Sequence, residues 1–99
     1  MNSLGLIELP NLADAVEAVD IMLKTADVKF LTWEKKLGGR LVTIIVQGSV
    51  SACQAAVEAA KTSASGRIVA SAVIANPHPE LMKIIEKSMK KHGFLEGIR

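Results

Sequence analysis

The chain has 99 residues and a net charge of +2, from 12 basic and 10 acidic side chains. This length fits one small domain, and the near balance of charge excludes the basic footprint expected of a nucleic-acid-binding protein. A single cysteine, Cys53, excludes an internal disulfide and a cysteine-rich metal site. Apolar residues make up 49% of the chain, and the seven glycines come in addition. Apolar residues and glycine together usually make up ~45–50% of a globular chain. We therefore expect other subunits to cover part of the apolar surface.

The first predicted elements are a strand, a helix and a second strand. Residues 4–9 form a short apolar run that ends at Pro10, and Asn11 is a suitable N-cap for the helix that follows. Residues 29–36 form the second strand. Between them, to about residue 24, helical spacing predicts one apolar stripe facing the core, made of Leu12, Ala15, Val16, Val19, Met22 and Leu23.

The next segment repeats this order of elements. Residues 41–48 are β-branched and end at Gly48, which predicts a strand. Ser49 can cap a helix that runs to about residue 64, and residues 67–75 form a fourth strand. With an offset of 37 residues, the Lys-Thr pair at 24–25 aligns with the pair at 61–62. Two such halves predict a ferredoxin-like α+β fold, a four-stranded antiparallel sheet with the helices on one face.

The C-terminal part is predicted to be one further helix. Pro79 suits the first helical position, and Glu80 lies near the positive end of the helix dipole. Leu81, Ile84 and Ile85 share one face of this helix. We therefore expect residues 1–99 to form a single domain, with a core at about 4–85 and a C-terminal helical extension at 86–99.

The sequence contains no set of residues typical of catalysis or metal binding. His78 and His92 have no second ligand at helical spacing, and Cys53 lies in an alanine-rich pattern that favours a buried position. The stretch "KLGGR" lacks the Lys-Ser/Thr ending of a phosphate-binding P-loop, and a strand follows it instead of a helix. Neither a signal peptide nor a membrane-spanning run is present. We predict no enzyme activity, no cofactor, no metal, no nucleic-acid partner and no membrane partner.

Four segments together resemble the hexameric shell proteins of bacterial microcompartments, the BMC domain family. They are "LGLIEL" (4–9), "ADAVEAVDIMLKTADV" (13–28), "KKLGGRLVTIIVQGSVSACQAAVEAA" (35–60) and "IVASAVIANPHPEL" (68–81). The resemblance implies a ferredoxin-like variant fold and flat cyclic hexamers with a narrow pore on the six-fold axis. It also implies that the hexamers tile with other shell proteins into a sheet around encapsulated enzymes, in a microcompartment shell within the cytoplasm.

The resemblance also assigns candidate site residues. It places Lys36, Leu37, Gly38, Gly39 and Arg40 at the pore, where glycine permits a close approach of backbone N–H groups to the axis and the two cations favour small polar or anionic metabolites. It places Lys24, Asn76 and His78 at the hexamer edge. Many family members carry arginine where this chain has Asn76, and glycine where it has Arg40.

The residues alone leave a second function open. Ferredoxin-like domains also serve as oligomeric small-molecule sensors, and the same loop would then be an anion pocket between subunits. Trp33, the only tryptophan, is expected to anchor the core or a subunit contact. The lysine-rich C-terminal helix is expected to be packed or solvated, with docking of encapsulated enzymes as the alternative.

Overall fold

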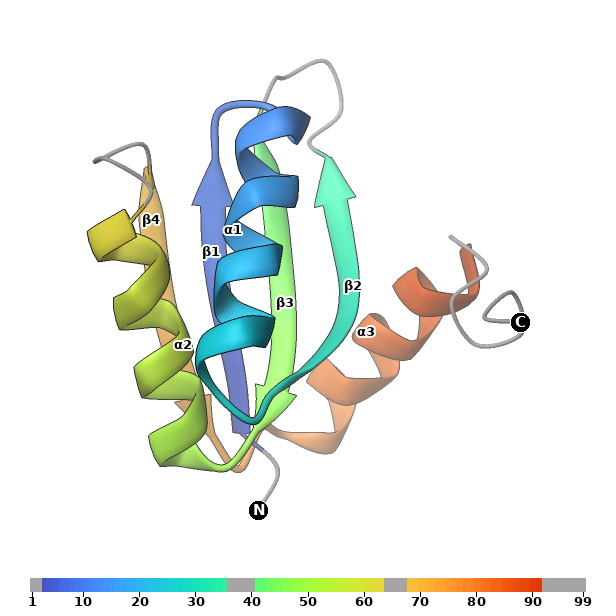
Figure 1. Ribbon diagram of the computed structural model, residues 1–99. Helices are drawn as coiled ribbons and strands as arrows, with labels where there is room; N and C mark the ends of the chain where they lie inside the picture. Colours follow the sequence, from blue (N-terminus) through green and yellow to red (C-terminus); the bar gives the residue numbers. More distant parts are fainter. Residues whose placement is uncertain (1–2, 36–40, 64–67, 92–99) are drawn as a thin grey trace.

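The computed structural model describes residues 3–35, 41–63 and 68–91. Its four strands form one antiparallel sheet in the order β2-β3-β1-β4, which confirms the ferredoxin-like α+β prediction (Figure 1). In chain order, the elements are β1 (Ser3–Leu9), α1 (Leu12–Thr25), β2 (Lys29–Lys35), β3 (Val42–Gly48), α2 (Val50–Ser63), β4 (Ala70–Ala75) and α3 (Pro79–Lys91).

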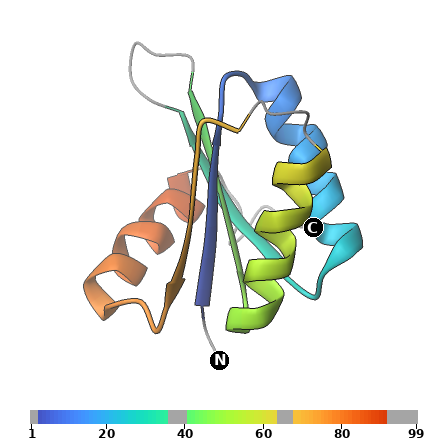
Figure 2. The same cartoon turned by 90° about the vertical axis from the view of Figure 1, so that its left-hand side faces the viewer.

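The helices lie on both faces of the sheet. Figure 2 shows α1 and α2 on one face and α3 on the other. The expectation of a single helical face therefore holds for the two helices of the internal repeat, whereas α3 covers the opposite face. None of the described helices is long and apolar enough to cross a membrane.

Side-chain caps begin both helices of the repeat, as predicted. The Asp14 backbone N–H donates to Asn11 Oδ1 over 2.8 Å, and Asn11 Nδ2 donates back to Asp14 Oδ2 over 3.1 Å. The Ala52 backbone N–H donates to Ser49 Oγ over 3.1 Å. These bonds satisfy backbone donors that the first turn of a helix leaves without partners.

Small side chains bring the two helices close to the sheet. Gly5 of β1 lies under α2, where an added Cβ would be 3.1 Å from Val46 Cγ2 and 3.3 Å from Val57 Cγ2. Alanine residues on both helices are fully buried in the same cluster, and they let the helix backbones approach each other and the sheet. The buried members of this first cluster are Ile7, Leu9, Ala15, Ala18, Met22, Val42, Ile44, Val46, Ala56, Val57 and Ala60.

The apolar stripe predicted for α1 is buried on one side only. Ala15 and Met22 are fully buried, whereas Leu12, Val16 and Leu23 are 49%, 61% and 43% exposed. At 100° per residue, the exposed arc lies about 100° from the centre of the buried one. The small residues and Met22 face the core and Val19 packs at its margin, whereas Leu12, Val16 and Leu23 project from the flank of the helix.

The second face of the sheet carries a smaller core under α3. Leu4, Leu31, Ile45 and Ile85 form it. A chain of polar groups then joins α3 to β2. Thr32 Oγ1 and Ser88 Oγ, both buried, are 2.7 Å apart, and Ser88 Oγ donates to Glu34 Oε2.

Lys91 reinforces this attachment from the last turn of α3. Its Nζ lies 3.5 Å from Glu34 Oε1. Together with the apolar core, these polar contacts attach the C-terminal half of α3 to β2.

Removing the buried hydroxyl of Ser88 should test this attachment. Ser88→Ala should lower the free energy of unfolding by about 1–3 kcal/mol, because buried Thr32 then loses its short hydrogen bond. The double variant Ser88→Ala/Thr32→Val should lose less than the sum of the two single changes, since it leaves neither buried hydroxyl unpaired. Urea denaturation followed by circular dichroism measures each loss, and strictly additive losses would contradict the hydrogen-bonded coupling.

Candidate functional site

The register of the sheet defines two opposite ends of the molecule. At one end, Leu9 and Lys35 both pair with Val42. At the other end, Ser3 pairs with both Gly48 and Ala75. We call these the loop end and the edge end. Figure 1 shows the loop end at the top, where α1 begins, and the edge end at the bottom, where α1 finishes.

The predicted pore residues belong to the loop end. Lys36, Leu37, Gly38, Gly39 and Arg40 lie outside the described residues. The strands that they connect are nevertheless paired up to the last described position, where Lys35 faces Val42. The segment therefore joins β2 to β3 at this end of the sheet, and the pore role of its residues stays a prediction.

The predicted edge residues belong to the opposite end. Lys24 lies in the last turn of α1, and its Nζ is 3.0 Å from Asp20 Oδ2, with the two side chains 75% and 58% exposed. The turn after α1 contacts the end of β3, because a Cβ at Gly48 would lie 3.0 Å from the Asp27 carbonyl oxygen. Since Gly48 and Ala75 both pair with Ser3, the structure brings the end of α1 and the end of β4 to the same end of the sheet.

Asn76 adopts a backbone conformation that the sequence did not reveal. Its φ is 49°, the only positive value outside glycine among the described residues. Asparagine enters this left-handed region more readily than most residues, and the region costs other side chains ~1–2 kcal/mol. The Asn-Pro dipeptide was a signal for a turn, but it did not identify the conformation. The turn between β4 and α3 thus favours asparagine over arginine at position 76.

His78 forms the N-terminal cap of α3. Its Nδ1 accepts from the Glu80 backbone N–H over 3.0 Å, and its carbonyl oxygen accepts from Leu81 and Met82 at 2.9 and 3.2 Å. Pro79 lies at the first helical position, as predicted, and needs no hydrogen-bond acceptor because proline has no backbone N–H. The imidazole therefore caps the first turn of α3. Its role at a hexamer edge stays a prediction.

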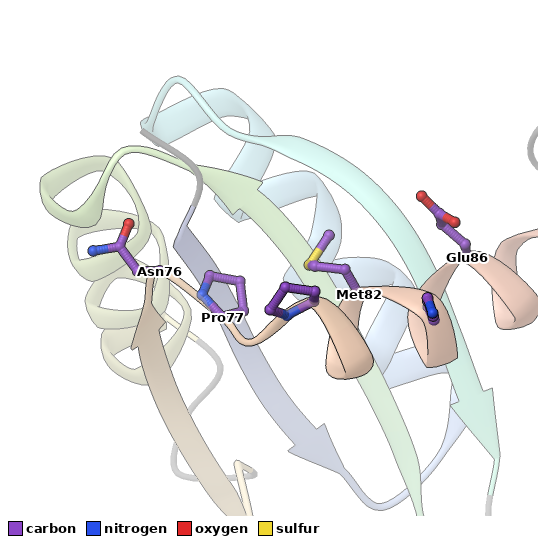
Figure 3. Close-up of a pocket in the computed structure, with 6 residues that line it drawn as sticks. Asn76, Pro77, Met82 and Glu86 are labelled. Atoms are coloured by element: carbon purple, nitrogen blue, oxygen red, sulfur yellow. The ribbon is translucent and has the colours of Figure 1, made fainter.

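A shallow hollow of about 520 Å³ adjoins this connection. Figure 3 shows it running from Asn76 along the first turns of α3 to Glu86. It opens widely to solvent, and its polar groups do not converge on one point, so it has the form of a contact surface. Within the described ranges, no group of three histidine, cysteine or acidic residues could hold a metal ion. The lining residues are Asn76, Pro77, Pro79, Met82, Lys83 and Glu86.

Cys53 is part of the core. Its side chain is fully buried, and Sγ donates to the Ser3 carbonyl oxygen over 3.5 Å. Burial raises the pKa of the thiol above its ordinary value of 9.0, and a hydrogen bond from the Gly48 backbone offsets part of that rise. Because only the thiolate is a strong nucleophile, this environment supports the interpretation of Cys53 as a structural residue.

Two exposed apolar surfaces flank the sheet on opposite sides. The α1 flank consists of Leu12, Val16 and Leu23. Positions of a right-handed helix advance clockwise when viewed from its N-terminus, so this arc faces away from α2 and toward the β2 side in Figure 1. The β4 flank, at the other edge of the sheet, exposes Val69 by 57% together with Ala70 and Ala72.

Trp33 and Phe30 of β2 lie below the α1 flank. Both are half-buried against the first cluster. Trp33 therefore contributes to the core, which was one of the two roles predicted for it.

Comparison with known families identifies relatives along most of the chain. Residues 3–77 match the BMC domain family. The chain is 40% identical to the bacterial microcompartment shell protein PduA of Salmonella typhimurium over 91 residues, which cover 90% of this chain and 96% of the relative. It is 41% identical to the shell protein EutM of the same organism over 92 residues, which cover 91% and 95% of the two chains.

A solved structure has the same fold. The crystal structure of a microcompartments protein from Desulfitobacterium hafniense DCB superposes with a TM-score of 0.77 at 32% identity. The match covers 89% of this chain and 48% of the other, so this chain spans about half the length of that protein.

The buried state of Cys53 predicts slow chemical modification. Near pH 8 the native protein should react with iodoacetamide at least about ten-fold more slowly than in guanidinium chloride, because the thiol is inaccessible and its pKa is raised. The raised pKa also stabilises the folded state below pH 9 and should cease to do so as the pH rises above that value. Mass spectrometry measures the labelling, and equal rates in the two solutions would contradict a buried thiol.

Proposed function

This chain belongs to the BMC domain family of bacterial microcompartment shell proteins, and from that premise we propose that it forms cyclic homo-hexamers with a central pore. The family match makes it a structural shell component and not an enzyme, located in the shell and assembling with other shell proteins. The observation that carries the hexamer proposal is the arrangement of the predicted pore segment and the predicted edge residues at opposite ends of one sheet.

This arrangement suits a wedge-shaped subunit of a ring. The seven-residue strands separate the two ends by about 20 Å, at ~3.3 Å per residue. With the loop end at the axis, six copies would bring residues 36–40 together around a pore. Lys24, Asn76 and His78 would then lie on the outer rim, where one ring can contact the next.

The two apolar flanks supply the contact between neighbouring subunits. A cyclic ring needs two different complementary surfaces on each copy, because each subunit binds its neighbours head to tail. The α1 flank and the β4 flank lie on opposite sides of the line that joins the loop end to the edge end. Pairing the flanks would bury side chains that are now 43% to 61% exposed, which agrees with the apolar surplus of the composition.

The pore is proposed to favour small anions. Six copies each of Lys36 and Arg40 would surround the axis with positive charge, and Gly38 and Gly39 would let backbone N–H groups approach it. Lys35, whose position is described, adds an exposed cation directly before this segment. Shell tiles of this kind would enclose enzymes and pass their small metabolites. Neither the match nor the geometry favours the ligand-sensor alternative.

The mass of the purified protein in solution tests the ring. Light scattering should give a mass near six times 10.5 kDa, and negative-stain electron microscopy should show six-fold particles that associate into sheets or tubes. Val16→Glu should instead give a smaller folded species, because it places a charge in the proposed interface while position 16 is open to solvent in a single copy.

A matched control separates the interface from general effects of charge. Ile84 is 65% exposed on α3, away from both flanks, so Ile84→Glu should keep the hexamer. A Val16→Glu hexamer as stable as the unmodified one would contradict the α1 flank as the interface. A monomer, dimer or trimer of the unmodified protein would contradict the hexamer.

Sulfate binding tests the charge of the pore. At equal ionic strength, sulfate should raise the Tm of the hexamer more than chloride does, because a ligand that binds the native assembly stabilises it. Lys36→Gln/Arg40→Gln should weaken sulfate binding by about ten-fold or more, since a hydrogen bond to a charged group contributes ~1.5–3 kcal/mol. Lys87→Gln, which removes an exposed lysine of α3, should leave the sulfate effect unchanged. An unchanged effect in the pore variant would contradict the proposal.

A further inference from the structure

A groove beside α3 carries exposed apolar surface that the two proposed ring flanks do not include. Its volume is about 370 Å³, and it is lined by residues of α3, β2 and β3 on the side of the sheet where α3 lies against β2 (Figure 1). We propose that residues 94–98 of the same chain fold back along α3 and fill this groove. The occupant is a segment of this chain, and the proposal does not depend on the hexamer.

The groove has an apolar floor and one exposed apolar wall. Ile45 of β3 and Ile85 of α3 form the floor and are 7% and 3% exposed, whereas Ile84 beside them is 65% exposed. Lys87 and Lys91 also line the groove. The isoleucines form a continuous apolar surface with cations next to it, which is more typical of an interaction site than a single exposed side chain is.

The shape of the groove suits a chain segment better than a small metabolite. Its volume is near the lower limit of the ~300–1,000 Å³ of small-molecule sites, and it opens widely to solvent, whereas such sites enclose most of their ligand. Apolar side chains of a peptide need only apolar area to cover, and their backbone can stay in contact with water.

Residues 94–98 match the groove in composition and charge. The segment reads Phe-Leu-Glu-Gly-Ile, so three of its five side chains are large and apolar. Glu96 adds one negative charge, and the cations that line the groove, Lys87 and Lys91, are complementary to it. The segment therefore brings both kinds of group that this surface can bind.

The segment begins where the groove ends. Lys91 lines the groove and is the last residue of α3. From Lys91 back to Ile84 the helix covers about 10 Å, at 1.5 Å per residue, and five extended residues span about 16 Å, at ~3.3 Å per residue. A reversal at residues 92–93 therefore lets the segment cover the whole groove, and Gly93 is the residue type most often found just after a helix.

The tether makes a weak contact sufficient. Because the segment is attached next to the groove, its effective concentration is in the ~mM range. Burial of three apolar side chains favours closure, and the ordering of five residues opposes it by a similar amount. The segment is thus a reversible cover that shields the apolar side of α3 from water and from other chains.

Cysteine cross-linking tests where the segment lies. Ile84→Cys/Gly97→Cys places one thiol on the groove and one in the segment, and it keeps the three apolar residues of the segment. Oxidised glutathione should join the two thiols within one chain. In the matched control, Glu86→Cys/Gly97→Cys, the exposed helix position lies about 200° around α3 from Ile84. This control should cross-link about ten-fold more slowly, because a disulfide needs its two Cα atoms within ~7 Å.

Labelling of single cysteines gives a second measurement. With iodoacetamide, Ile84→Cys should react more slowly than Glu86→Cys. Adding Phe94→Asp/Leu95→Asp should raise the rate at position 84 about ten-fold, because it opens the cover, and should leave the rate at position 86 unchanged. Peptide mass spectrometry distinguishes these sites from Cys53.

The outcomes separate this inference from the proposed function. Equal cross-linking at positions 84 and 86, or a labelling rate at position 84 that the segment does not change, would overturn the cover. A disulfide between two chains would also overturn it and would assign the segment to a neighbouring subunit. Light scattering of the unmodified protein and of each variant reports the ring independently, so absence of hexamers would count against the proposed function alone.

Discussion

The close packing of small side chains between two helices and a sheet is the constraint on which the rest of this molecule depends. Gly5 lets α2 contact β1, and buried alanines let α1 lie beside α2. A helix packed so closely admits few large residues to the core, chiefly Met22, and Leu12, Val16 and Leu23 project sideways. The apolar surface proposed to join subunits is thus a direct consequence of how the core is filled.

The sheet also separates the functions of the molecule in space. The described strands run between its two ends, so the ends of β2 and β3 that flank the proposed pore segment lie opposite the proposed edge residues. The flanks are the surfaces proposed for contacts within the ring. In the proposed ring, this small domain would make three different kinds of contact, at its tip, along its sides and at its rim, without any surface serving two of them.

The sequence predicted local features well, because they depend on neighbouring residues. Asn11 and Ser49 cap their helices, and the β-branched run forms β3, since capping groups and strand-forming residues act within a few positions. Features that depend on distant partners were missed. Nothing local to Ser88 indicates that Thr32 lies 2.7 Å away, and helical periodicity could not distinguish the core arc of α1 from its flank. The left-handed conformation of Asn76 depends on the path of the chain before and after it, which the local sequence does not reveal.

The position of β1 has a consequence for the order of events during synthesis. This first strand lies in the interior of the sheet, between β3 and β4. Its backbone partners leave the ribosome long after it does, and the last of them ends at Ala75. The nascent chain must therefore leave one side of this apolar strand without backbone partners until β4 has been made, and pairing of such distant segments is slow. The β2 edge of the sheet can pair once β3 has been made, whereas the opposite edge is complete only when β4 has followed.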